Sequence, residues 1–138
     1  FYDKKEIGAL GISNCYDLDV LKYLFNNAKV KPSIVQNRFY AQSAYDKEIR
    51  SFCNENQITY ESFWSLTANP NILSSDILEN LALKYQKGVA EIFYRFLNHI
   101  NITPLNGTTS LKHMIEDLKI GEFELTREEI NSIYNLLN

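Results

Sequence analysis

The sequence has little of what defines several large classes of protein. Its 138 residues contain two cysteines, three prolines and five glycines. Two cysteines cannot form the disulfide framework of a small secreted domain, and so little proline and glycine excludes a collagen-like or low-complexity chain. With 45% hydrophobic and 22% charged residues, the composition is that of one soluble globular domain with enough apolar side chains for a core.

Long apolar runs and clusters of positive charge are also missing. No run approaches the roughly 18 to 20 residues of a membrane-spanning helix, and the polar start FYDKKE is unlike a signal peptide. The net charge is −3, and the 14 Lys and Arg residues are scattered, which argues against nucleic acid or an anionic membrane as a partner. We therefore expect a cytoplasmic protein that binds neither nucleic acid nor membranes.

The spacing of potential metal ligands is not that of a zinc site. Cys15, Cys53, His99 and His113 form neither a C-x-x-C nor an H-x-x-x-H pair. We predict no metal site and two free thiols that are at least partly buried.

Short apolar runs alternate with segments of helical spacing. Strands are predicted in IGALGISN (7–14), PSIVQN (32–37), ITYESF (58–63) and INITPL (100–105). The helices between them include one opened by a possible capping box in SAYD (43–46), and a final covering helix begins with a second capping box in TREE (126–129). This alternation predicts parallel βα units, in either an open doubly wound sheet or part of a (β/α)8 barrel.

Polar residues follow every predicted strand. Ligands of parallel sheets bind at the C-terminal ends of the strands. The residues at these ends are Ser13 and Asn14, Gln36 and Asn37, Ser62 to Ser65, and LNGTTS (105–110). Their hydroxyl and amide groups predict a hydrogen-bonding rim for a polar, planar ligand. A P-loop and a G-x-G-x-x-G turn are absent, so these phosphate-binding signatures of open sheets have no support.

The motifs GISN, PSIVQN, SFWSLTANPNIL, PLNGTTSLKHMIEDL and FELTREEINSI follow one another in the order and spacing of the second half of an aldo-keto reductase. The chain thus resembles the C-terminal half of a (β/α)8 TIM-barrel of that family over residues 1–138, with about four βα units and a covering helix. The resemblance implies nicotinamide-dependent reduction of a small carbonyl substrate to an alcohol, with NADP(H) or NAD(H). The catalytic Tyr, Lys, Asp and His belong to the N-terminal half, which this chain lacks, so we expect it to supply the cofactor-binding half and no catalytic residue.

The resemblance also implies roles for individual residues. Ser13, Asn14 and Gln36 would hydrogen-bond the carboxamide of the nicotinamide, and Phe63 would stack on its ring. Trp64 would point the other way if the strand continues. The loop from Leu66 to Asn69 would cover the pyrophosphate. The contacts expected to hold the remaining phosphate and the adenine are Gly107, Thr108, Thr109, Ser110, Glu116 and Asp117.

Two features leave alternatives open. Thr109 and Ser110 occupy positions where the family commonly has Arg or Lys, and Lys112 and His113 are the nearby cations, so the choice between NADP and NAD stays open. Four βα units would leave two strand edges unpaired and an apolar inner face uncovered, which predicts pairing with the missing half, pairing with a second copy, or marginal stability. The alternative function is a non-catalytic, reductase-like regulatory or interaction subunit.

Overall fold

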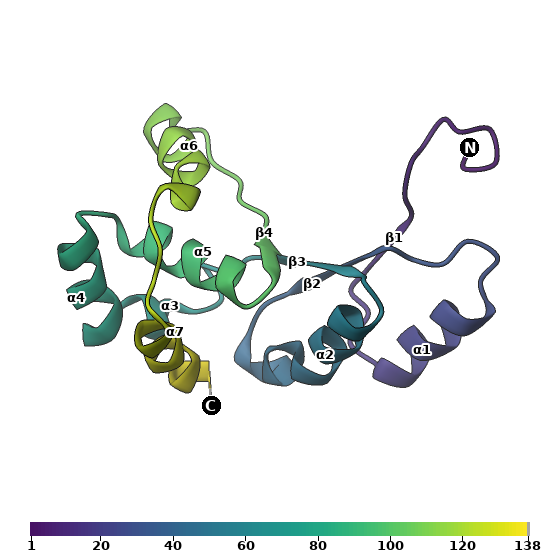
Figure 1. Cartoon of the computed structure of the whole chain (residues 1–138), viewed down its shortest axis with the longest axis horizontal. Coiled ribbons are helices and arrows are strands. Elements are labelled where there is room, and N and C mark those ends of the chain that lie inside the picture. The colour runs from purple at the N-terminus through teal and green to yellow at the C-terminus, as the bar shows by residue number, and fades with distance from the viewer. Residues whose placement is uncertain (138) are drawn as a thin grey trace.

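The computed structural model describes residues 1–137 and contains a sheet of four parallel strands. The strands are β1 (Gly11–Ser13), β2 (Ile34–Arg38), β3 (Thr59–Phe63) and β4 (Ile102–Pro104). Their order in space is their order in the chain (Figure 1). A doubly wound sheet reverses its strand order at a switch point, so the sequential order favours a barrel segment among the two expected architectures.

Seven helices are described between and after these strands. They are α1 (Leu18–Asn27), α2 (Lys47–Glu55), α3 (Pro70–Leu73), α4 (Asp76–Tyr85), α5 (Val89–His99), α6 (Leu111–Leu118) and α7 (Arg127–Tyr134). Helices α1 and α2 lie together on one side of the sheet in Figure 1, and α4, α5 and α7 gather near the other end of the molecule. The one-turn helix α3 was not expected from the sequence.

Alternation along the strands decides which side chains enter the core. Val35, Tyr60 and Ile102 are register neighbours on β2, β3 and β4, and all three are buried. Helix α5 adds its apolar face to the same core through Ile92, Phe93, Phe96 and Leu97. Burial of these side chains is the main stabilising contribution to the fold.

The opposite face of the sheet carries a row of polar residues. Ser13, Gln36, Glu61 and Thr103 are successive register partners across the four strands, and each is partly or fully exposed. We call these four residues the polar row. The expectation of an apolar inner face is therefore wrong at this level of the sheet, because strand alternation assigns the large apolar side chains to the helix-covered face.

The first predicted strand is shorter than its apolar sequence suggested. Only Gly11–Ser13 pairs with β2, and Ile7 and Leu10 are exposed. The neighbouring strand β2 itself begins at Ile34, the register partner of Gly11, so the run before Gly11 has no strand residue beside it.

One of the two predicted capping boxes is present. Thr126 Oγ1 accepts a hydrogen bond from the Glu129 amide at 3.3 Å, and a Glu129 carboxylate oxygen accepts one from the Thr126 amide at 2.7 Å. The box predicted in SAYD is wrong: α2 begins at Lys47, and Asp46 makes no capping bond. Asp46 and the two residues before it have φ near +50°, and the Asp46 carboxylate is instead bonded within the core.

The two thiols are free and buried, as predicted. Burial, reinforced by the charge of Asp46, raises the pKa of Cys53 to about 12. Both thiols therefore stay protonated at neutral pH.

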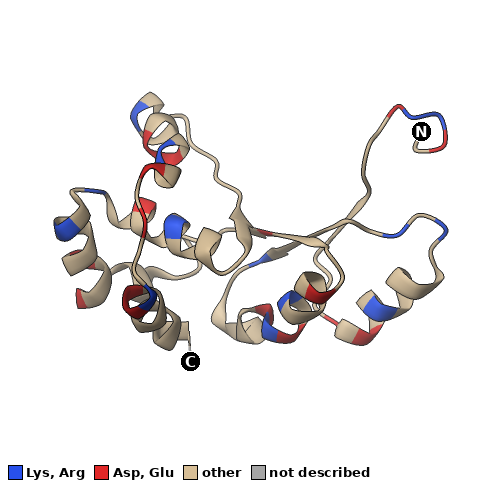
Figure 2. Ribbon diagram, in the orientation of Figure 1, with Lys and Arg blue, Asp and Glu red and all other residues tan. Residues whose placement is uncertain are grey.

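Among residues 1–137, no helix combines the length and the apolar character needed to cross a membrane. Positively and negatively charged residues are interspersed along the helices, most visibly on α2 (Figure 2). This mixed pattern agrees with the scattered charge of the sequence.

Candidate functional site

Ser13, Asn14 and Gln36 come together at the C-terminal edge of β1 and β2. Ser13 is the register partner of Gln36, and the Asn14 amide donates to the Gln36 carbonyl at 3.0 Å. Asn14 has a φ of 57°, a left-handed conformation that Asn tolerates better than most residues. The turn that ends β1 therefore places the three predicted amide and hydroxyl side chains next to one another.

Local hydrogen bonds orient the two amide groups of this cluster. Asn14 Nδ2 donates to Ser13 Oγ at 3.2 Å, and the Tyr16 hydroxyl donates to Asn14 Oδ1 at 3.3 Å. Gln36 Nε2 donates to Glu61 Oε2 at 2.9 Å. Sequence reasoning missed Glu61, although strand alternation could have found it, since Glu61 lies two residues before Phe63 and so on the same face.

Asn37 points to the opposite face from Gln36 and is fully buried. Its Oδ1 accepts from the Cys15 amide at 2.9 Å, and its Nδ2 donates to the Cys15 carbonyl and to Asp46 Oδ2, both at 2.7 Å. The Tyr60 hydroxyl also donates to Asp46 Oδ2 at 2.7 Å. Asn37 therefore anchors the backbone next to Asn14 and does not belong to the ligand-facing rim, contrary to expectation.

Ser62 and Ser65 likewise turn away from the rim. Both are buried, and their hydroxyls bond to each other at 2.8 Å. The polar rim is thus narrower than the sequence predicted, because Asn37 near the end of β2 and Ser62 and Ser65 near the end of β3 face the core.

Phe63 is the last residue of β3 and pairs in register with Arg38. Trp64 follows with a φ of 55°, so the strand does not continue and the condition for Trp64 to point away is not met. Trp64 is 58% exposed, and the centre of its ring lies 4.3 Å from the Arg38 guanidinium carbon in a cation–π contact. Sequence reasoning did not find Arg38 at this edge.

A cavity of about 500 Å³ opens between the segments that follow β3 and β4. Phe63, Leu66 and Gly107 line it, together with Trp64 and Tyr94. Three of the predicted cofactor residues therefore share one cavity at the C-terminal edge of the sheet.

Asn69 is placed differently from those cavity residues. Its side chain is buried, and its Nδ2 donates to the carbonyls of Phe39 and Ser65, each at 2.8 Å. These bonds close the segment 65–69 against the end of β2, so in this structure the Asn69 side chain shapes the loop.

A neighbouring cavity of about 570 Å³ lies between β4 and α6. Gly107, Thr108 and Asp117 line it, as do Asn106 and Tyr94. Asn106 Nδ2 donates to Asp117, whose pKa is nevertheless raised because burial disfavours its charge. Burial and the nearby Asp117 raise the pKa of Tyr94 to about 12. Asn106 belongs to the predicted rim segment 105–110, whereas Tyr94 was not predicted.

Three predicted residues, Thr109, Ser110 and Glu116, lie just before α6 or on it and outside the lining of these two cavities. Ser110 caps α6, since its Oγ accepts from the His113 amide at 3.4 Å, and its own amide donates to Thr108 Oγ1 at 3.1 Å. Glu116 pairs with Lys112 at 3.6 Å, and Thr109 is exposed.

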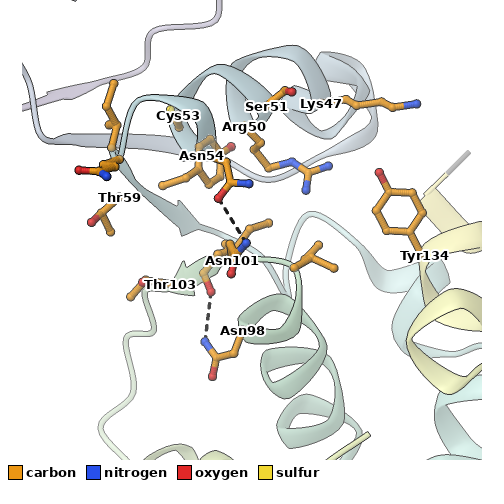
Figure 3. Close-up of a pocket in the computed structure, with 15 residues that line it drawn as sticks. Lys47, Arg50, Ser51, Cys53, Asn54, Thr59, Asn98, Asn101, Thr103 and Tyr134 are labelled. Atoms are coloured by element: carbon orange, nitrogen blue, oxygen red, sulfur yellow. Dashed lines mark hydrogen bonds between the residues drawn. The ribbon is translucent and has the colours of Figure 1, made fainter. Parts of the chain in front are cut away.

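A larger cavity of about 720 Å³ lies at the other end of the sheet, between α2 and α5 (Figure 3). Lys47, Arg50, Asn54 and Asn101 line it, and Asn101 Nδ2 donates to Asn54 Oδ1 at 3.4 Å. None of the predicted site residues is there. Parallel sheets bind their ligands at the C-terminal ends of the strands, so the two smaller cavities form the better candidate site.

The model of the Aldo/keto reductase family matches residues 2–138, and the chain belongs to this family. It is 28% identical over 132 residues to glyoxal reductase of Bacillus subtilis, covering 96% of this chain and 47% of that protein. It is 26% identical over 131 residues to aldose reductase B of Dictyostelium discoideum, covering 94% of this chain and 42% of that protein. The chain thus spans about half the length of the curated relatives it matches.

Solved structures show the same fold. An aldo-keto reductase from a Medee basin deep-sea metagenome library superposes with a TM-score of 0.87 at 24% identity, covering 99% of this chain and 50% of that one. A silkworm (Bombyx mori) aldo-keto reductase complexed with NADPH gives a TM-score of 0.81 at 19% identity, covering 96% of this chain and 43% of that one. The four parallel βα units therefore correspond to half of an aldo-keto reductase (β/α)8 barrel.

Proposed function

We propose that residues 1–138 are the C-terminal, cofactor-binding half of an aldo-keto reductase that reduces an aldehyde or ketone with NADP(H) or NAD(H). The observation that carries this proposal is the cluster of Ser13, Asn14 and Gln36 at one edge of the sheet, with Phe63 at the end of β3. Proteins of this family use NAD(P)H, and the silkworm relative was solved with NADPH.

The chemistry of the cluster suits a primary carboxamide. A carboxamide offers one carbonyl acceptor and one NH2 donor. Asn14 Nδ2 and Ser13 Oγ can meet the carbonyl, and Gln36 Oε1, left free by the bond from Nε2 to Glu61, can accept from the NH2 group. Phe63 offers an aromatic face for the ring that carries the carboxamide.

The two cavities along the segments after β3 and β4 would hold the rest of the dinucleotide. Leu66 and Gly107 would lie against the pyrophosphate, and Thr108 and Asp117 nearer the adenosine end. The amides that precede α6 lie at a helix N-terminus, where the helix dipole and free N–H groups favour a phosphate.

In this proposal the bound cofactor supplies the hydride for reduction of the carbonyl. Ser13, Asn14, Gln36 and Phe63 would bind the nicotinamide and orient its ring toward the substrate. The proton donor for the new alcohol and most contacts to the substrate would come from the other half of the barrel.

The test is a titration of the natural-length protein that contains these residues with NADPH and with NADH. Trp64 is the single tryptophan among residues 1–138 and lines the cavity after β3, so tryptophan fluorescence should change when the cofactor binds. Gln36→Leu and Asn14→Gly, which tolerates the φ of 57°, should each weaken binding about 2- to 12-fold, the value of one neutral hydrogen bond. Asn80→Ala, an exposed amide on α4, is the control and should bind like the wild type.

Absence of binding by either cofactor would refute the proposal and favour the interaction subunit considered above. An interaction subunit would fold and capture its partner equally well with and without Gln36 and Asn14.

A further inference from the structure

Glu61 is the neighbour of Gln36 in the polar row and its hydrogen-bond partner. The two residues are register partners on β3 and β2, and both side chains leave the sheet on the face opposite the core. Gln36 Nε2 donates to Glu61 Oε2 at 2.9 Å, and neither side chain is fully exposed. The cofactor roles considered above do not include Glu61.

The chemistry of this bond determines which way the Gln36 amide faces. A carboxylate only accepts hydrogen bonds, so it bonds to the NH2 group of Gln36 and not to its carbonyl. With Nε2 turned toward Glu61, Gln36 Oε1 faces away from the carboxylate, makes no hydrogen bond within the described residues and can meet a ligand. Gln36 therefore presents an acceptor.

Asn14 presents the complementary group. The Tyr16 hydroxyl donates to Asn14 Oδ1 at 3.3 Å, so the amide oxygen is turned toward Tyr16. Asn14 Nδ2 donates to Ser13 Oγ at 3.2 Å and has a second hydrogen to offer. The edge of β1 and β2 thus shows one oriented acceptor and one oriented donor.

We infer that Glu61 is a positioning residue for the cofactor: it holds Gln36 in the one amide orientation that accepts a hydrogen bond from the NH2 group of the nicotinamide carboxamide. This inference rests on the proposed function. Glu61 acts through Gln36, and its removal frees the Gln36 amide to rotate and to present its own NH2 group to the ligand. Two NH2 groups cannot bond to each other, so the contact is lost.

The experiment compares NADP⁺ with its 3-acetylpyridine analogue, which keeps the carbonyl oxygen but has a methyl group in place of the NH2 group. The wild-type natural-length protein should bind NADP⁺ about 2- to 12-fold more tightly than the analogue, because the analogue lacks one neutral hydrogen bond. Gln36→Leu should bring this affinity ratio to about 1, because Gln36 is the residue that accepts the hydrogen bond from the NH2 group.

Glu61→Gln should lower the ratio of affinities for NADP⁺ and the analogue by at least half. An amide at position 61 can donate as well as accept, so it no longer holds the Gln36 amide in one orientation. Glu61→Ala should do the same and guards against a fold defect specific to the first variant. In the Gln36→Leu background, Glu61→Gln should leave the ratio unchanged, since the two residues act as one unit. Glu55→Gln, an exposed carboxylate on α2 whose partner is Ser51, is the matched control.

A purely structural role for Glu61 would weaken binding of both nucleotides by the same factor. The inference would therefore be overturned if Glu61→Gln and Glu61→Ala both kept the wild-type ratio of affinities for NADP⁺ and the analogue. The proposed function would still stand. Failure of the wild type to bind NADP⁺, NADPH or NADH would overturn the proposed function itself, and the positioning role of Glu61 with it.

Discussion

Replacing Glu129 by Gln should destabilise the packing of α7 against α4. Glu129 accepts hydrogen bonds from the Thr126 amide at 2.7 Å, the Tyr85 hydroxyl at 2.7 Å and Lys84 Nζ at 2.6 Å. Burial opposes ionisation of Glu129, but these three donors outweigh it and lower the pKa of Glu129 to about 2. One carboxylate therefore caps α7 and ties it to the end of α4.

The magnitude follows from the pKa. A fall of the Glu129 pKa from the ordinary 4.5 to about 2 corresponds to about 3 kcal/mol of unfolding free energy for a group shielded from solvent. The Lys84 side chain is 56% exposed, and solvent screens its pair with Glu129. We therefore expect a contribution of about 1 to 2 kcal/mol. Because the folded-state pKa is the lower one, the stabilisation is fully present above about pH 4.5. It is lost as the pH falls toward 2.

The assay is urea denaturation of the wild type and Glu129→Gln at pH 7, 4 and 2.5. The difference in unfolding free energy should be about 1 to 2 kcal/mol at pH 7 and should shrink as the pH falls below 4.5. Glu128→Gln is the control, since Glu128 shares the first turn of α7 and its helix dipole but is exposed. Equal differences at all three pH values, or equal effects of the two substitutions, would refute the role assigned to Glu129.

Three further predictions concern the core. Leu97→Ala should cost about 2 to 5 kcal/mol of unfolding free energy in urea denaturation, because Leu97 is fully buried, whereas Leu83→Ala, at a side chain that is 78% exposed, should cost less than about 0.5 kcal/mol. Tyr60→Phe removes one of the two bonds to the Asp46 carboxylate and should cost about 1 to 3 kcal/mol by thermal unfolding; an unchanged midpoint would contradict the buried network. The Cys53 thiol, buried with its pKa raised to about 12, should react with a thiol reagent at pH 8 only after denaturant is added, and fast labelling of the folded protein would disprove its burial.

Local sequence patterns predicted most of the secondary structure. The helical spacing that begins at Leu18 and the break at Gly88 mark real helix boundaries, and the TREE capping box opens α7 as expected. These features depend on residues three or four positions apart, which the sequence displays directly. The failure at SAYD has a tertiary cause, because Asn37 and Tyr60, distant in sequence, bind the Asp46 carboxylate that would otherwise be free to cap.

The sequence by itself determined the alternating strands and helices, the polar character of the strand ends and the membership of the aldo/keto reductase family, because periodicity and motif order are properties of the chain. Only the tertiary structure decided which of these polar residues face the core and which lie on the opposite side of the sheet. Gln36 and Asn37 are adjacent and chemically alike, yet pairing with β3 turns Gln36 toward Glu61 and burial turns Asn37 toward Asp46. The reason is physical: the register of parallel strands sets which residues become neighbours, and that register is fixed by packing of the whole sheet against its helices.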